Sequence, residues 1–340
     1  MILVTGGAGY VGSHTCVELL NAGYEIVVVD NLSNSHATSL ERVSKITGKT
    51  FPFYEMDLRD AEALDKICEK YKPTCVIHFA GLKAVAESVA VPVKYYENNL
   101  LSTTTLLKAM EKHGIKQIVF SSSATVYTAT DVMPLTEESA TGGCTNPYGW
   151  TKYMCEQIIT DTVKANQGWC ATLLRYFNPI GAHESGLIGE DPQGVPNNLL
   201  PYVAQVAVGK LPELPLTGDD FNTPDGTGVR DYLHVCDLAA GHVAAVKFCQ
   251  KSTGAYPINL GTGKGSSVLE IITTFQQVNN IKVPYRIMPR RPGDIAMCYA
   301  NPQKAEELLG WRTVKTLEEM CRDLWRWQTN NPTGYTGDGK

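Results

Sequence analysis

The feature that most constrains the fold is a glycine-rich turn between an apolar segment and a helical pattern near the N-terminus. After MILVT (1–5) the chain reads GGAGYVG, which places Gly6, Gly9 and Gly12 three residues apart and also contains a G-x-G-x-x-G pattern that starts at Gly7. Glycine is needed where the backbone turns sharply from a strand into a helix and where it must approach a pyrophosphate closely. The turn therefore predicts a strand–turn–helix unit that binds a dinucleotide.

An acidic residue follows at the distance that such a unit requires. Asp30 ends the next apolar run, EIVVVD (25–30), about 20 residues after the glycines. A carboxylate can accept hydrogen bonds from both hydroxyls of an adenosine ribose, whereas it repels a phosphate on that ribose, and the following DNLSNSH contains no arginine. The sequence therefore predicts NAD rather than NADP.

Apolar runs alternate with helical patterns through the first half of the chain. Strands that are apolar on both faces are expected where helices cover both sides of a sheet. We therefore expect an α/β fold with a Rossmann-type, doubly wound parallel sheet and a smaller mixed α/β substrate-binding domain. The predicted strands lie at 1–5, 25–30, 50–57, 74–80, 116–123 and 170–177.

The composition of the chain changes near residue 178, where loops rich in Gly, Pro, Asn and Asp begin. Long loops without regular structure inside a compact chain are usually functional, and 340 residues exceed the usual size of one domain. The predicted division is an NAD-binding domain at 1–177 and a substrate-binding domain at 178–340. A strand pattern at 255–263 suggests that a segment near 232–263 returns to the first sheet.

Composition argues against several other classes of protein. Acidic and basic residues are interleaved at a net charge of −5, so no basic surface for nucleic acid is indicated. No run of about 18 apolar residues occurs, and the first residues do not resemble a signal peptide. The ten cysteines are scattered without a C-x-x-C pair or a His/Cys cluster. We expect a cytoplasmic protein with reduced thiols, without a metal site and without a nucleic-acid or membrane partner.

A tyrosine and a lysine stand four residues apart at the start of a predicted helix, in TNPYGWTKYMCE (145–156). Asn146 is a good N-cap and Pro147 a good first helical residue, so Tyr148 and Lys152 share one helix face. By itself such a pair is more often a half-buried phenol beside a solvated ammonium.

Beside NAD the same pair could perform acid–base chemistry. A phenol with a pKa of about 10 must be lowered by roughly three units, or about 4 kcal/mol, to act as a base near neutrality. Two unit charges about 4 Å apart at an effective dielectric of about 20 interact by about 4 kcal/mol, so Lys152 and the oxidised nicotinamide could together supply this shift. FSSSATVY (120–127) adds serine hydroxyls at the end of the fifth strand.

The glycine loop, the serine cluster and the Y-x-x-x-K pattern together resemble the extended short-chain dehydrogenase/reductase family. Within it the chain is most similar to the enzymes that epimerise UDP-galactose and UDP-glucose at C4, over essentially its whole length, through segments such as VVDNLSNS, HFAGLKAVAESV, LRYFNPIGAH, DGTGVRDYLHVCDLA and RRPGD. This resemblance implies a reversible, NAD-dependent epimerisation through a transient 4-keto sugar. It also implies that NAD stays bound and is regenerated in each turnover.

The resemblance further implies which residues act. Ser123, Tyr148 and Lys152 would form the catalytic group, with Tyr148 as the base that takes the proton of the sugar 4-hydroxyl. Besides these three, the residues implied to line the NAD site are Gly6, Gly9, Tyr10, Val11, Gly12, Asp30, Asn31, Leu32, Ser33, Asn34, Ser35, Asp57, Leu58, Phe79, Ala80, Gly81, Leu82, Lys83, Asn98 and Phe177.

The nucleotide end of the substrate is implied to bind in the second half of the chain. Arg230 and Arg291 match positions that hold the diphosphate, a role that suits the permanent charge and forked geometry of arginine, and Arg290 could share it. Asp294 matches a residue that accepts the uridine ribose hydroxyls. The other implied substrate contacts are Asn178, Asn198, Leu199, Tyr232 and Cys298, with Ser123 and Tyr148. The family also implies a homodimer whose helices near 90–112 and 147–166 pair across subunits.

Three positions depart from the family pattern. Thr217 stands where a phenylalanine near uracil is usual, and Thr128 follows VY where glycine is usual. Cys298 occupies a position that carries a bulky tyrosine in relatives strict for UDP-galactose and UDP-glucose. Because a thiol leaves more room beside sugar C2, we hypothesise that UDP-N-acetylglucosamine and UDP-N-acetylgalactosamine are also interconverted, unless the neighbouring Tyr299 fills the gap.

Alternative functions share part of this pattern. A nucleotide-sugar 4,6-dehydratase, or another short-chain dehydrogenase acting on sugar nucleotides, would also use the glycine loop, Tyr148 and Lys152. Related dehydratases carry Asp-Glu just before VY to remove the C5 proton and expel water, whereas this chain has Ala124 and Thr125 there. A non-catalytic NAD-binding protein on the same fold would not require Ser123, Tyr148 and Lys152.

Overall fold

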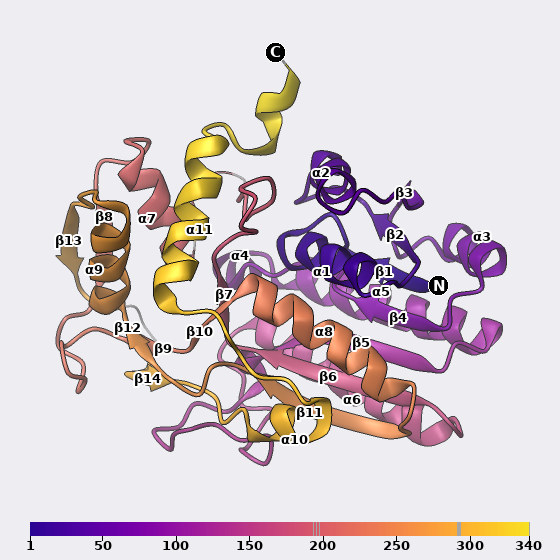
Figure 1. Cartoon of the computed structure of the whole chain (residues 1–340). Helices are drawn as coiled ribbons and strands as arrows, with labels where there is room; N and C mark the ends of the chain where they lie inside the picture. Colours follow the sequence, from indigo (N-terminus) through magenta and orange to yellow (C-terminus); the bar gives the residue numbers. More distant parts are fainter. Residues whose placement is uncertain (193, 195, 197, 291–293, 340) are drawn as a thin grey trace.

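A seven-stranded parallel sheet forms the centre of the molecule, in the strand order β11-β6-β5-β4-β1-β2-β3 (Figure 1). The computed structural model describes residues 1–192, 194, 196, 198–290 and 294–339. Each of the six strands predicted for the first half is present, so the predicted doubly wound sheet is confirmed. The strands are β1 (Ile2–Thr5), β2 (Ile26–Asp30), β3 (Phe53–Glu55), β4 (Cys75–His78), β5 (Gln117–Ser123), β6 (Cys170–Tyr176) and β11 (Gly254–Leu260).

Helices cover both faces of this sheet because neighbouring side chains along each strand point to opposite sides. In β1, Ile2 and Val4 belong to the apolar core on one face, whereas Leu3 belongs to the core on the other. The first face is covered by α1 (Tyr10–Asn21), α2 (Ala37–Thr47) and α8 (Val235–Cys249), and the second by α3 (Ala61–Tyr71), α5 (Pro92–His113) and α6 (Pro147–Ala165). The short helix α4 (Val85–Ala90) packs against α5 and α6.

The remaining elements of the second half form three small sheets and a group of helices beside the central sheet (Figure 1). Two segments of this half instead join the central sheet: β11 pairs with β6 along its whole length, and α8 packs against α1. The other elements are β7 (Asn178–Ile180), α7 (Leu199–Ala207), β8 (Leu214–Thr217), β9 (Val229–Arg230), β10 (Tyr232–His234), β12 (Ser266–Ser267), α9 (Val268–Asn279), β13 (Tyr285–Met288), β14 (Met297–Cys298), α10 (Gln303–Leu309) and α11 (Leu317–Asn330), with the short 3₁₀ helices η1 (Ala124–Val126) and η2 (Gly334–Gly339).

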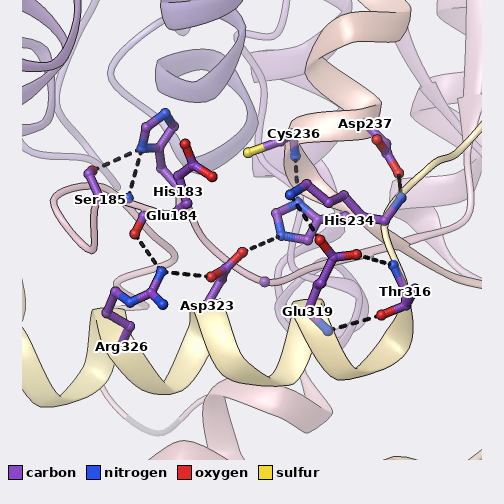
Figure 2. A network of polar contacts seen from close by, with 12 residues as sticks. His183, Glu184, Ser185, His234, Cys236, Asp237, Thr316, Glu319, Asp323 and Arg326 are labelled. Atoms are coloured by element: carbon purple, nitrogen blue, oxygen red, sulfur yellow. Dashed lines mark hydrogen bonds and ion pairs between the residues drawn. The ribbon is translucent and has the colours of Figure 1, made fainter.

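Helix α11 is tied to the loop after β7 and to the end of β10 by a polar network (Figure 2). His234 Nδ1 accepts a hydrogen bond from the Cys236 N–H at 3.0 Å, and its Nε2 lies 3.3 Å from Asp323 Oδ2 on α11. Arg326, one turn further, donates to Asp323 Oδ1 at 2.9 Å and to the Glu184 carbonyl. The C-terminal helix therefore holds the loop that follows β7 in place.

Helix α6 begins as its sequence predicts. Asn146 is the N-cap, its Oδ1 accepts a hydrogen bond from the Gly149 N–H at 2.9 Å, and Pro147 is the first helical residue. Tyr148 therefore lies in the first turn of the helix and Lys152 in the next.

No helix among the described residues is long and apolar enough to cross a membrane. No group of His, Cys, Asp and Glu side chains within these residues is arranged to hold a metal ion. All ten cysteines are free thiols.

Candidate active site

Most residues of the predicted NAD site lie at the carboxyl ends of the central strands. The glycine loop follows β1, and Asp30 and Ser123 are the last residues of β2 and β5. In a parallel sheet these ends share one edge, and the strand order here reverses between β1 and β4. The other predicted residues lie in the segments after the strands or in the helices. The segment after β2 carries Asn31, Leu32, Ser33, Asn34 and Ser35, the one after β3 carries Asp57 and Leu58, the one after β4 carries residues 79–83, and the one after β6 carries Phe177. Helix α1 begins with Tyr10, Val11 and Gly12, α5 contains Asn98, and α6 contains Tyr148 and Lys152.

The glycines of the loop are required by close packing of the backbone. A Cβ on Gly6, whose φ is 73°, would lie 2.6 Å from the Ala80 backbone nitrogen, and a Cβ on Gly12 would lie 2.3 Å from the Gly6 oxygen. Gly9 is the N-cap of α1 and brings no side chain to the first N–H groups of that helix. The loop therefore leaves a helix N-terminus available to an anionic group.

Asp30 organises the loop and the turn that follows β2. Its Oδ2 accepts a hydrogen bond from the Ala8 N–H at 3.0 Å, and its Oδ1 accepts from the Leu32 N–H at 3.0 Å and from the Ser35 hydroxyl at 2.8 Å. Each carboxylate oxygen has two lone pairs, so Oδ2 can accept a further hydrogen bond. The carboxylate is thus held in a fixed orientation at the edge of the sheet.

Ser123, Tyr148 and Lys152 lie together at the end of β5. Burial raises the pKa of the Tyr148 phenol to about 12, and a hydrogen bond with Ser123 opposes this rise. Burial lowers the pKa of the Lys152 ammonium to about 8. Lys152 Nζ donates to the Ser121 carbonyl at 2.7 Å and lies 5.9 Å from the centre of the Tyr148 ring.

The raised phenol pKa differs from the lowered value that the sequence analysis expected beside bound NAD. In the protein by itself the cost of burying a phenolate dominates, and the ammonium of Lys152 is directed at the carbonyl of Ser121. The lysine charge alone therefore does not make Tyr148 a base near neutrality.

A buried ion pair between α6 and β6 lies next to Lys152. Glu156 follows Lys152 by one turn of α6, and Arg175 on β6 donates to it through Nε at 3.0 Å and Nη2 at 2.8 Å. The Ser122 hydroxyl donates to the same carboxylate at 2.6 Å. Glu156 and Arg175 are only 2% and 4% exposed. This two-bond contact fixes α6 relative to β5 and β6 and so positions Lys152.

Several predicted substrate residues come together in the small sheets. Tyr232 on β10 lies directly opposite Asn178 on β7, and Cys298 on β14 lies directly opposite Arg230 on β9. Arg230 Nη2 is 3.7 Å from Asp294 Oδ1. Burial raises the pKa of Tyr232 to about 12, and the charge of Arg230 opposes that rise.

The other residues considered for the substrate have different surroundings. Asn198 and Leu199 lie at the N-terminus of α7. Arg290 pairs with Asp220, with its Nε 2.6 Å from Oδ1, and stacks 4.1 Å from the centre of the Phe221 ring. The predicted Arg291 lies outside the described residues.

Two of the departures from the family pattern have structural surroundings of their own. Thr128 holds the loop after η1, because its hydroxyl accepts a hydrogen bond from the Gly143 N–H at 3.1 Å. Thr217 is the last residue of β8 and pairs with Met288 on β13.

The sequence analysis does not single out Asn99, which connects two parts of the site. Its Oδ1 accepts from the Leu82 N–H at 2.8 Å, and its Nδ2 donates to the Leu82 carbonyl at 3.0 Å and to the Thr151 hydroxyl at 2.9 Å. It therefore fixes the segment after β4 against α6, beside Lys152. The sequence signal that could have indicated Asn99 is its position on the helix face that also carries the apolar residues Tyr95, Leu106 and Met110.

Comparison with known proteins identifies the family. The model of the family described as GDP-mannose 4,6 dehydratase matches residues 3–324. The chain is 62% identical over 334 residues to the UDP-glucose 4-epimerase of Bacillus subtilis, with 98% of each chain covered, and 57% identical over 334 residues to that of Haemophilus influenzae, with 98% of this chain and 99% of the relative covered. The crystal structure of UDP-glucose 4-epimerase from Bifidobacterium longum in complex with NAD⁺ and UDP has a TM-score of 0.94 at 55% identity, covering 98% of this chain and 99% of that one. The chain belongs to the UDP-glucose 4-epimerase family.

Membership in the UDP-glucose 4-epimerase family confirms the resemblance expected from the motifs, and with it an isomerase that acts on carbohydrates. The matched family model is described as a 4,6-dehydratase, which is the alternative reaction that the sequence also suggests. Ala124 and Thr125 form η1 at the end of β5 and supply neither the acid nor the base that elimination needs. These residues therefore favour a 4-epimerase over a dehydratase.

Proposed function

We propose that this protein catalyses the reversible C4 epimerisation of UDP-glucose and UDP-galactose with a tightly bound NAD that is regenerated in each turnover. The observation that carries the proposal is the meeting of Tyr148, Ser123 and Lys152 at the sheet edge that also bears the glycine loop and Asp30. Membership in the UDP-glucose 4-epimerase family supports the same reaction.

The loop after β1 fits a dinucleotide. Side chains at Gly6 and Gly12 would collide with backbone atoms, so the loop can lie close to a pyrophosphate, and the start of α1 offers N–H donors to it. Asp30 retains acceptor capacity for ribose hydroxyls. We therefore propose that the residues predicted from the sequence, from Gly6 to Phe177, hold NAD.

Bound NAD would supply the hydride acceptor and donor for sugar C4. Tyr148 would take the proton of the 4-hydroxyl and later return it, and the Ser123 hydroxyl would hydrogen-bond the reacting oxygen. The ammonium of Lys152 would favour the phenolate form of Tyr148 through its positive charge. These roles require only groups that already lie together at the end of β5.

The proposal is tested by denaturing the purified protein and analysing what it releases, together with the products of turnover. One NAD per chain and a product of unchanged mass, with hydrogen label retained at C4, are expected. A product lighter by one water would indicate a dehydratase, and label exchanged freely with solvent would refute hydride return by a captive cofactor.

We also propose that the second half of the chain binds the nucleotide sugar, with a division near residue 177. Arg230, Arg291 and Asp294 would bind the diphosphate and the uridine ribose. Asn178, Asn198, Leu199 and Tyr232 would complete these contacts. Support comes from the proximity of Arg230 to Asp294 and from the direct pairing of Asn178 with Tyr232.

A wider substrate range is a second proposal, and it rests on Cys298. Successive residues of a strand point to opposite faces, and a ring carbon of Tyr299 would lie 3.5 Å from a Cβ placed on Gly265. Tyr299 is therefore directed toward Gly265 and away from the face that carries Cys298. Turnover of the N-acetylated UDP sugars is expected, and Cys298→Tyr should abolish it while sparing UDP-glucose. Absence of N-acetyl turnover at saturating substrate would refute this proposal.

We further propose a cytoplasmic homodimer. Helices α4 and α5 carry the exposed apolar side chains Val85, Val89, Val93 and Leu101, the third of which is 74% exposed. A second copy packed on this face would cover them, and the free thiols suit a reducing compartment. Sedimentation should give twice the chain mass, and Val93→Glu should shift the protein toward monomer.

A further inference from the structure

Glu190 links a residue of the proposed cofactor site to a residue of the proposed substrate site. Its Oε1 accepts a hydrogen bond from Lys83 Nζ at 3.1 Å and another from Asn198 Nδ2 at 2.9 Å. Lys83 lies in the segment after β4, and Asn198 lies at the N-terminus of α7. One carboxylate oxygen thus bridges the two halves of the chain.

The backbone that carries Glu190 is fixed by the C-terminal part of the chain. Trp327 Nε1 on α11 donates to the Glu190 carbonyl at 3.1 Å, and the Tyr335 hydroxyl lies 3.1 Å from both the N and the O of Gly189. Gly189 packs so closely on the Trp327 ring that a Cβ there would lie 2.4 Å from it. Figure 2 shows the same helix holding the preceding residues of this loop through Arg326. The backbone of residues 189 and 190 is therefore held in place, and with it the position of the Glu190 side chain.

The partners of Glu190 are much less constrained than Glu190 itself. The Glu190 side chain is 7% exposed, whereas the side chain of Lys83 is 51% exposed. A long lysine side chain in solvent samples many rotamers, and a charge-assisted hydrogen bond to a buried carboxylate selects one of them. Asn198 is the N-cap of α7 but makes no side-chain cap bond, so its amide is oriented by Glu190.

From this geometry we propose that Glu190 is a positioning residue that couples retention of the cofactor to binding of the nucleotide sugar. The proposal rests on the proposed function, in which Lys83 contacts NAD and Asn198 contacts the substrate. By orienting both side chains at once, Glu190 makes each site better formed when the other is occupied. This role is separate from the roles proposed for the glycine loop and for Tyr148 and Lys152.

The test uses Glu190→Gln, which keeps the size of the side chain but removes the charge that holds Lys83 and strengthens the hydrogen bond from Asn198. The purified variant should release clearly less than one NAD per chain after prolonged dialysis. The KM for UDP-glucose and the Kd for UDP should rise about tenfold, which corresponds to about 1.4 kcal/mol. The value of kcat per bound NAD should change little, because Tyr148, Ser123 and Lys152 are untouched.

Two further backgrounds separate positioning from a merely structural role. In Lys83→Met the loss of NAD caused by Glu190→Gln should disappear, and in Asn198→Ala its effect on the Kd for UDP should disappear, because the partner through which Glu190 acts is gone. Glu190→Asp, which keeps the charge, should restore part of the NAD content. If Glu190→Gln does not fold, Glu190→Asp in the same two backgrounds gives the same comparison.

Asp191→Asn is the matched control, because this neighbouring carboxylate accepts a hydrogen bond from the Tyr335 N–H at 2.8 Å and pairs with His36. It should leave NAD content and the Kd for UDP as in the wild type. Equal losses in both variants, full effects of Glu190→Gln in both backgrounds, or wild-type behaviour of Glu190→Gln would each overturn the inference. Failure of the wild type to hold NAD or to interconvert the two sugars would instead refute the proposed function.

Discussion

The two groups of proposed site residues are held in different ways. The catalytic group depends on a 19-residue helix, a side chain of Lys152 that is nearly buried, and the Glu156–Arg175 pair beneath it. In the substrate group, strands of two or three residues carry Asn178, Arg230, Tyr232 and Cys298. The side chains of Arg230 and Asp294 are 22% and 30% exposed. Chemistry that depends on shifted pKa values needs a buried and rigid frame, whereas binding a charged nucleotide needs groups that reach solvent.

The comparison predicts its largest effect on turnover at Tyr148. Tyr148→Phe removes the hydroxyl that exchanges the proton and should lower kcat by about 10²- to 10⁴-fold, while NAD content stays at the wild-type level. Steady-state kinetics and the absorbance of released cofactor measure the two quantities. Tyr153→Phe on the same helix is the control and should leave kcat nearly unchanged. Normal activity of Tyr148→Phe would refute the assigned base.

The next effect concerns stability beneath the catalytic group. Glu156→Gln leaves the buried Arg175 without its counter-charge and should lower the free energy of unfolding by about 3 kcal/mol or more. The exposed pair of Glu87 with Lys94 offers a control, because Glu87→Gln should cost less than about 1 kcal/mol. Denaturant titration measures both variants. Similar losses in the two would contradict the rigid frame inferred for the catalytic group.

A smaller effect on binding is expected in the substrate group. Arg230→Lys keeps the charge but loses the forked contact with a phosphate, and should raise the KM for UDP-glucose by about tenfold, about 1.4 kcal/mol, with little change in kcat. Arg290→Lys should change the KM less, because Arg290 is engaged with Asp220 and Phe221. A fall in kcat without a change in KM would place Arg230 with the catalytic group instead.

A pH dependence of stability is also expected around the central sheet. Burial lowers the pKa of His14 and His78 to about 3 and that of His242 to about 4, from 6.5. Between pH 6.5 and 4 the unfolded chain binds protons that the folded chain does not, so the free energy of unfolding should fall as pH decreases, by up to about 1.4 kcal/mol per pH unit for each histidine. Denaturant titrations from pH 7 to 5 measure the slope, and His78→Leu should reduce it. An unchanged slope would show that His78 is protonated in the folded chain.

Local sequence signals were sufficient for the sheet and for the start of the catalytic helix. The glycine loop, the apolar runs, Asn146 with Pro147, and the spacing of Tyr148 and Lys152 each depend on residues within one or two turns of one another. The contacts that join distant segments were not accessible in the same way. Lys83 and Glu190 are 107 positions apart, and no period or cap marks either as a partner of the other.

The sequence by itself determined the strands of the central sheet, the dinucleotide loop and the residue types of the proposed chemistry, because each follows from backbone preferences and short spacings. Only the tertiary structure decided that burial raises the pKa of Tyr148, that Asn178 pairs with Tyr232, and that Glu190 bridges Lys83 and Asn198. Burial and long-range pairing depend on which surfaces pack together, and that is a property of the whole chain.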